Sequence, residues 1–116
     1  MATRTNLWRY RETFSDTSDL VGYDVEATDG HIGKIDKASN EAGRSYLVVD
    51  TGFWIFGKKR MIPAGVADRV DHDDRKVYIR MTKEEVKSAP DFDEQRTSWS
   101  DADYEPSERY YDPFGW

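Results

Sequence analysis

The sequence predicts an all-β protein, a small barrel of about six short antiparallel strands with one short C-terminal helix and extended arms at both ends. Short apolar stretches recur between residues 20 and 86, and turn-forming residues separate them about every 8–12 positions, a pattern typical of barrels and sandwiches. The length of 116 residues allows a single domain. We favour a barrel because closure removes the exposed edges that so small a sheet would otherwise have.

The first hairpin is marked by the clearest turn in the sequence. Residues 20–27 form the first predicted strand. Asp29-Gly30 follows, and this dipeptide supplies the positive φ angles that a tight hairpin needs. The next strand contains Ile32 and Ile35, which are three residues apart instead of two. Gly33 lies between them, so we expect a β-bulge that returns both isoleucines to the inward face.

Later strands are predicted from their apolar content. Residues 46–50 (YLVVD) form a central strand because their apolar character is nearly continuous, and residues 53–56 (FWIF) resume the run after Gly52. Pro63 lacks an N–H group and should lie at a strand end or a sheet edge. Residues 76–81 alternate between polar and apolar side chains, which predicts a strand with one buried face.

The short helix is predicted from its capping residues. Residues 64–70 suggest only a single helical turn or an irregular segment before the last strand. Thr82 and Glu85 have the spacing of a capping box, in which each side chain accepts a hydrogen bond from the backbone of the other. A helix over residues 83–88 should follow and end before Pro90.

The net charge of the chain is concentrated in its last quarter. The formal charge is −6, and acidic and basic side chains balance over residues 1–87. Residues 88–116 contain eight acidic side chains but only Arg96 and Arg109 as basic ones. An acidic tail repels phosphate groups and a neutral barrel attracts them little, which argues against nucleic acid as a partner.

Targeting and redox features favour a cytoplasmic location. No apolar run approaches the roughly 18 residues that a membrane-spanning helix needs, so no transmembrane segment is predicted. The first residues lack the apolar region of a signal peptide. The chain contains no cysteine, which excludes disulfides and thiolate ligands. We therefore expect a cytoplasmic protein.

The ordered series of motifs resembles the PRC-barrel family. The matching motifs are the L-x-G start at residues 20–22, D-G-x-x-G-x-I at residues 29–35, the strand at residues 46–50 and M-I-P at residues 61–63. The resemblance spans residues 18–92, which we assign to the barrel domain. Residues 1–17 are then an N-terminal arm, and residues 93–116 an acidic, aromatic-rich C-terminal tail.

The resemblance implies a compact bacterial or archaeal barrel without catalytic residues common to the family. Members include the cytoplasmic domain of the photosynthetic reaction-centre H subunit and the C-terminal domain of a ribosome maturation factor. We expect in this chain neither the membrane anchor of the first, because no apolar run is long enough, nor the N-terminal domain of the second, because residues 1–17 are too short to form one. It is therefore most similar to the free-standing members of the family.

No catalytic, cofactor or metal site is predicted. Residues 71–74 (DHDD) have metal-ligand types, but Arg75 stands where a calcium loop needs an oxygen ligand and no glycine follows, so a polar turn explains them. His31 and His72 have no spacing that selects an orienting partner, and we interpret His31 as a surface residue. Motifs of phosphate-binding loops and nucleophilic enzymes are absent from the sequence.

Contact with other macromolecules is the predicted function. Residues 53–56 place large apolar side chains on both faces of a strand, although a small barrel has only one interior. Either an arm or the tail covers the outer pair, or Trp54 and Phe56 anchor a dimer interface. The tail should wrap a barrel, its own or a partner's. The predicted interface residues are the aromatic ones of both segments: Phe53, Trp54, Phe56, Trp99, Tyr110, Tyr111, Phe114 and Trp116.

Three functional hypotheses follow from these patterns. The first is a non-catalytic assembly module that forms a homodimer and binds an unidentified protein partner. The second is an RNA- or ribosome-associated factor that uses the basic turn at residues 58–60 beside aromatic side chains. The third is a small ligand-binding protein or enzyme, which a deep pocket with convergent polar groups would favour.

Overall fold

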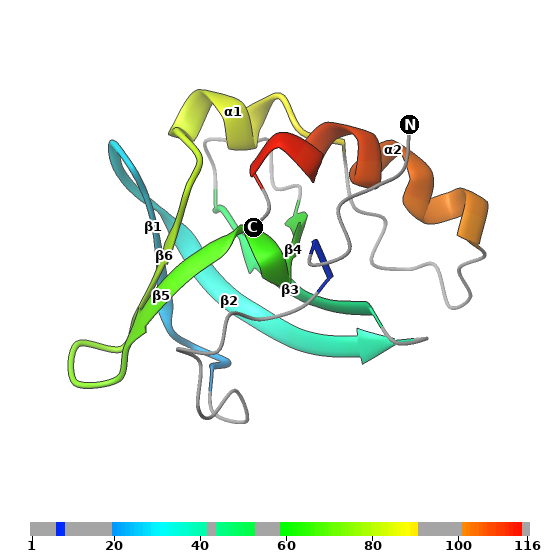
Figure 1. Ribbon diagram of the computed structural model, residues 1–116. Helices are drawn as coiled ribbons and strands as arrows, with labels where there is room; N and C mark the ends of the chain where they lie inside the picture. The colour runs from blue at the N-terminus through cyan, green and yellow to red at the C-terminus, as the bar shows by residue number, and fades with distance from the viewer. Residues whose placement is uncertain (1–6, 9–19, 42–43, 53–58, 91–100, 115–116) are drawn as a thin grey trace.

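Six strands form one sheet in the computed structural model, which describes residues 7–8, 20–41, 44–52, 59–90 and 101–114 (Figure 1). The strands are β1 (Asp24–Ala27), β2 (Gly30–Glu41), β3 (Arg44–Asp50), β4 (Lys59–Pro63), β5 (Ala67–Asp71) and β6 (Lys76–Ile79). The helical elements are η1 (Ala64–Val66), α1 (Lys83–Lys87), α2 (Asp101–Tyr111) and η2 (Asp112–Phe114). The predicted mainly-β class is confirmed.

The strand order is β4-β3-β2-β1-β6-β5. All neighbouring pairs are antiparallel except β1 and β6, which run parallel. The prediction of purely antiparallel strands is therefore wrong. The cause is η1, which carries the chain from β4 into β5 without the reversal that a hairpin would give. Because β6 then reverses against β5, it runs in the direction of β1. Among the described strands no ladder joins β4 to β5, so the sheet is open.

The bulge predicted in the second strand is confirmed. In the ladder between β1 and β2, Ile32 is the extra residue between two paired positions. Ile32 and Ile35 are both buried as a result. Gly33 follows the bulged residue, and a Cβ atom built there would lie 2.1 Å from the main-chain oxygen of Asp50. The glycine is thus required by the close approach of β3.

Two boundaries differ from the predicted ones. Strand β1 begins at Asp24 and not at residue 20, because Gly22 adopts a φ of 90° and the N–H of Tyr23 closes a turn onto the carbonyl of Leu20. The single helical turn expected within residues 64–70 is η1, but β5 follows it at once. Pro63 is the last residue of β4, which is an edge strand of the sheet, as predicted.

Helix α1 begins with the predicted capping box. The hydroxyl of Thr82 accepts a hydrogen bond from the N–H of Glu85 (3.2 Å), and the Glu85 carboxylate accepts one from the N–H of Thr82 (2.8 Å). The N–H of Lys83 donates to the carboxylate of Asp29 (2.8 Å), which lies in the β1–β2 turn. These bonds fix α1 against the first hairpin.

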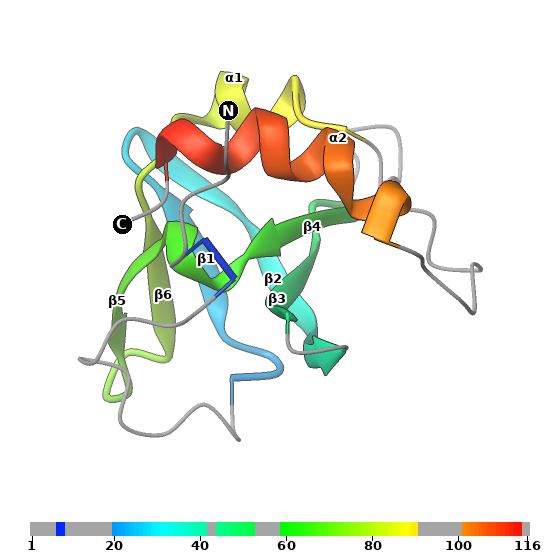
Figure 2. The same ribbon diagram turned by 45° about the vertical axis from the view of Figure 1, so that its right-hand side comes forward.

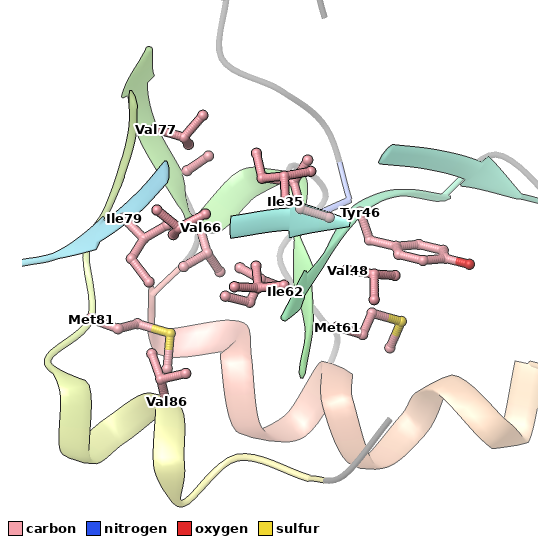
Figure 3. Close-up of a cluster of buried hydrophobic side chains, with 14 of the residues drawn as sticks. Ile35, Tyr46, Val48, Met61, Ile62, Val66, Val77, Ile79, Met81 and Val86 are labelled. Carbon is pink, nitrogen blue, oxygen red and sulfur yellow. The ribbon is translucent and has the colours of Figure 1, made fainter. Parts of the chain in front are cut away.

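The hydrophobic core fills the space between the curved sheet and the two helices, which lie side by side along one flank of the sheet (Figures 1 and 2). Figure 3 shows Ile62, Val66, Ile79 and Met81 gathered in this space. The core also includes residues outside positions 20–86, the range in which the apolar stretches of the sequence recur: Leu7, Trp8, Ala89, Tyr104 and Tyr111 are all buried. Both ends of the chain therefore contribute to the compact unit.

The C-terminal tail was predicted to be an extended arm, and this is wrong for residues 101–114. Tyr104, Ser107 and Tyr111 are buried at helical spacing, so packing against the sheet gives α2 its periodicity. A proline inside the helix and many polar residues hide that pattern in the sequence. None of the described helices is long and apolar enough to cross a membrane.

Candidate functional site

A cluster of residues from three distant parts of the chain holds helix α2. We define it as the tail-docking site, and it consists of Trp8, Arg44, Tyr46, Tyr104 and Glu108. The Trp8 ring meets the Tyr104 ring edge-on, with centroids 5.6 Å apart, and the Tyr46 ring at 6.4 Å. Such edge-to-face pairs stabilise by about 0.5–1.5 kcal/mol beyond the burial of their area. Trp8 is thus packed between Tyr46 of the sheet and Tyr104 of the tail.

Glu108 is the polar centre of the tail-docking site. Its Oε1 atom accepts a hydrogen bond from Nε1 of Trp8 (3.2 Å) and lies 3.5 Å from Nε of Arg44. The Arg44 guanidinium also lies 4.3 Å from the centroid of the Tyr104 ring, in cation–π geometry. The Arg44 and Glu108 side chains are only 18% and 20% exposed, so solvent screens this ion pair less than a surface pair.

A second set of contacts fixes the far end of the tail. The phenol of Tyr110 donates a hydrogen bond to the carbonyl of Glu85 in α1. Nη1 of Arg80 donates to the carbonyl of Phe114 (3.3 Å). The rings of Tyr110 and Phe114 are 6.2 Å apart, and the Tyr111 ring meets Tyr110 edge-on at 5.3 Å. The tail is therefore held at both ends of α2.

The two adjacent tyrosines of α2 differ in their hydrogen bonding. Tyr111 is fully buried, and its hydroxyl has no hydrogen-bond partner within the described part of the chain. Burial raises the pKa of Tyr111 well above its usual range, and burial together with the nearby Glu85 carboxylate raises the pKa of Tyr110. Both phenols therefore stay protonated at neutral pH, but only that of Tyr110 has an acceptor in place.

We predict opposite effects for the matched variants Tyr110→Phe and Tyr111→Phe. The first removes a hydrogen bond to a main-chain carbonyl and should lower the free energy of unfolding by about 1 kcal/mol. The second removes a buried hydroxyl without a partner and should leave stability equal or higher. Urea unfolding of both variants and the unchanged protein measures the difference. A loss in Tyr111→Phe as large as that in Tyr110→Phe would contradict this interpretation.

The structure brings together three of the predicted interface residues. Tyr110, Tyr111 and Phe114 lie in one aromatic group, but Tyr111 faces the core of its own chain. The other predicted interface residues lie outside the described residues: Phe53, Trp54, Phe56, Trp99 and Trp116.

Sequence reasoning did not predict the tail-docking site. A weak signal exists in the tail, because a tyrosine, a glutamate and a second tyrosine occur at positions 104, 108 and 111, on one face of a helix. Nothing in the sequence pairs that face with Trp8 or Arg44, which are distant along the chain and meet it only in the fold.

Lys59 and Arg60 of the predicted basic turn at residues 58–60 belong to strand β4. Strand β4 begins at Lys59, so Arg60 lies within the sheet and is only 3% exposed. Its guanidinium donates to the carbonyls of Val86 (3.1 Å) and Lys87 (3.0 Å) at the end of α1. Nζ of Lys59 pairs with the Asp36 carboxylate at 2.9 Å. Lys58 lies outside the described residues. Arg60 and Lys59 are thus engaged within the chain.

Both histidines have partners that the sequence did not identify. His31 has an exposed side chain, as predicted, and its Nδ1 lies 2.6 Å from a carboxylate oxygen of Glu26. Nδ1 of His72 lies 2.9 Å from the hydroxyl of Tyr23. Across the described residues, no three histidine or acidic side chains gather in a way that could hold a metal ion.

A shallow hollow of about 360 Å³ lies where β2 passes the end of β3, lined by residues 31–34 and 50–52. At its rim the ammonium group of Lys34 binds the Asp24 carboxylate at 2.9 Å, and this bond lowers the pKa of Asp24. Gly52 forms the opposite rim. It is exposed, and no atom lies within 4 Å of a Cβ built there. The hollow thus opens to solvent beside the point where the chain enters residues 53–58.

Comparisons with protein-family models and with curated proteins give no match for this chain.

Proposed function

We propose that this chain is a non-catalytic module of the PRC-barrel type that assembles with other proteins, and first with a second copy of itself. The topology supports the barrel part of the proposal. The two edge strands of the sheet, β4 and β5, are consecutive in the chain and are joined by the three-residue helix η1. The connection therefore brings the two edges to one corner of the sheet, as a barrel requires.

One observation carries the assembly part of the proposal: the aromatic run at residues 53–56 directly follows a surface turn. The N–H of Gly52 donates to the carboxylate of Asp50 (2.9 Å), which closes the turn, and both residues are exposed. Asp50 pairs with Lys59 on β4, so residues 51–58 connect the two strands at this end of the sheet. Large aromatic side chains, tryptophan above all, are favoured anchors of protein interfaces.

The test is the oligomeric state of a Trp54→Ala variant. If Trp54 anchors a homodimer, the variant should dissociate with a dissociation constant raised roughly thirty-fold or more, because central aromatic anchors contribute about 2 kcal/mol or more. Sedimentation equilibrium over a range of protein concentrations measures this constant. Val21→Ala is the matched control, since Val21 is an apolar side chain that is 53% exposed elsewhere on the surface.

Two results would count against the proposal. If the unchanged protein is monomeric at every concentration tested, the homodimer is excluded. If Trp54→Ala and Val21→Ala dissociate equally, a dimer exists but residue 54 is not its anchor. The RNA-associated alternative has less support, because Arg60 and Lys59 of its basic turn are engaged within the chain.

A further inference from the structure

Helix α2 depends on its docking site for its helical form. It has 11 residues and contains Pro106 in its interior. Isolated helices shorter than about 12–15 residues are marginal in water, and an interior proline weakens them further. The burial of Tyr104 and Tyr111 is what compensates for this weakness. An undocked α2 would therefore lose its structure, so the helix should occupy a docking site at all times.

The contacts that dock α2 do not depend on its neighbours in the chain. Trp8 lies 100 positions before Glu108, and Arg44 and Glu85 belong to the sheet and to α1. Trp8, Arg44 and Tyr46, the members of the tail-docking site outside α2, thus form the receiving surface for this helix. It recognises two tyrosines seven positions apart and the carboxylate of Glu108 between them. Any copy of this segment satisfies the same contacts.

The chain between α1 and α2 is long enough to reach a neighbouring molecule. Ten residues, 91–100, separate Pro90 from the start of α2 at Asp101. A segment of this length spans up to about 33–36 Å when extended. The longest dimension of the molecule is 37 Å. A tether of this length can therefore span nearly the whole length of one molecule.

We propose that the tail-docking site is a helix-binding groove, and that in the homodimer each groove holds α2 of the other copy. This inference rests on the proposed self-association and names the segment that is exchanged. The exchange is reciprocal, so it closes a two-fold dimer and leaves no open site. It follows the helix-in-groove mode of recognition, with Tyr104 and Tyr111 as anchors and the Glu108–Arg44 pair fixing the register.

Charge reversal at Arg44 and Glu108 tests the exchange. Arg44→Glu sets two carboxylates against each other, and Glu108→Arg sets two guanidinium groups against each other, so each variant alone should dock its tail poorly. When the two variants are mixed, exchange joins each tail to a groove of opposite charge. The heterodimer should then exceed either homodimer by about tenfold or more, because like-charge contacts across interfaces are strongly disfavoured.

Two affinity tags, one on each variant, measure the heterodimer by sequential capture, and thermal unfolding of the mixture reports the recovery of stability. The double variant Arg44→Glu with Glu108→Arg is the matched control, because it restores opposite charges both within one chain and between two. If a single variant is too unstable to purify, the two are co-expressed, and a captured heterodimer is the same positive result.

The proposal is overturned if the mixture unfolds as the sum of its two components and yields no heterodimer above the statistical share. In that case α2 docks only within its own chain. A concentration-dependent dimer of the unchanged protein, together with a weakened dimer in Trp54→Ala, would still support the proposed function. If the unchanged protein is monomeric at every concentration tested, both the proposed homodimer and the exchange of α2 are excluded.

Discussion

Gly33→Ala is expected to destabilise the protein by about 3 kcal/mol or more, up to complete loss of folding. A Cβ atom at this position would lie 2.1 Å from the carbonyl oxygen of Asp50 and 2.9 Å from its carbonyl carbon. Both atoms belong to the backbone of β3, so relief requires β2 and β3 to separate. Overpacking a well-fitted interior commonly costs about 1–3 kcal/mol, and a clash with backbone lies at the upper end or beyond.

Gly52→Ala is the matched control for this experiment. Gly52 has a φ of 68°, which alanine adopts at a cost of roughly 1–2 kcal/mol, but no atom obstructs a Cβ there. Urea unfolding and far-ultraviolet circular dichroism of both variants separate a steric clash from backbone strain. Equal losses in the two variants would show that β3 does not approach Gly33 as closely as the structure has it.

Arg60→Met is expected to lower the free energy of unfolding by about 2–4 kcal/mol. Methionine keeps the apolar stem of the side chain but leaves the carbonyls of Val86 and Lys87 without the guanidinium that now binds them. Hydrogen bonds to charged groups contribute about 1.5–3 kcal/mol each, and buried acceptors that lose their donors carry a desolvation cost. Arg60→Lys should restore little, because a lysine cannot bind two carbonyls with a planar fork.

Lys59→Met is the control for the Arg60 variant, since it removes the neighbouring positive charge. Lys59 binds the half-exposed carboxylate of Asp36, and such pairs contribute about 0–1 kcal/mol. Chemical denaturation of the two variants compares a buried guanidinium with a surface ammonium group at adjacent positions. If Lys59→Met is less stable than Arg60→Met, Lys59 and not Arg60 contributes more to stability, which would contradict this prediction.

The parts of the fold that local chemistry determines could be predicted from the sequence. The Asp29-Gly30 hairpin, the bulge at Ile32 and the capping box of Thr82 and Glu85 each depend on residues close together in the chain. The parallel pair of β1 and β6 could not be predicted, because η1 had to be recognised as a corner and not as a hairpin.

The candidate site was harder to predict than the fold for a related reason. Aromatic residues in the tail were identified as interaction residues, but the sequence does not show whether they face their own chain or a neighbour. Arg60 was assigned to a basic turn that could contact RNA, and only the packing of α1 against β4 shows that its guanidinium is buried. Trp8, Arg44 and Glu108 carry no local pattern that joins them.

The parallel ladder between β1 and β6 has a consequence for how the chain is made. Asp24 pairs with Lys76, so β1 has no partner on that side until nearly all of the strands have been synthesised. Contacts between such distant positions form late, because the entropy of closing the intervening loop must be overcome first. On the ribosome the hairpins of β1, β2, β3 and β4 can form as they emerge, whereas the other edge of β1 must wait for β6. The helix that covers the core, α2, leaves the ribosome only after all six strands.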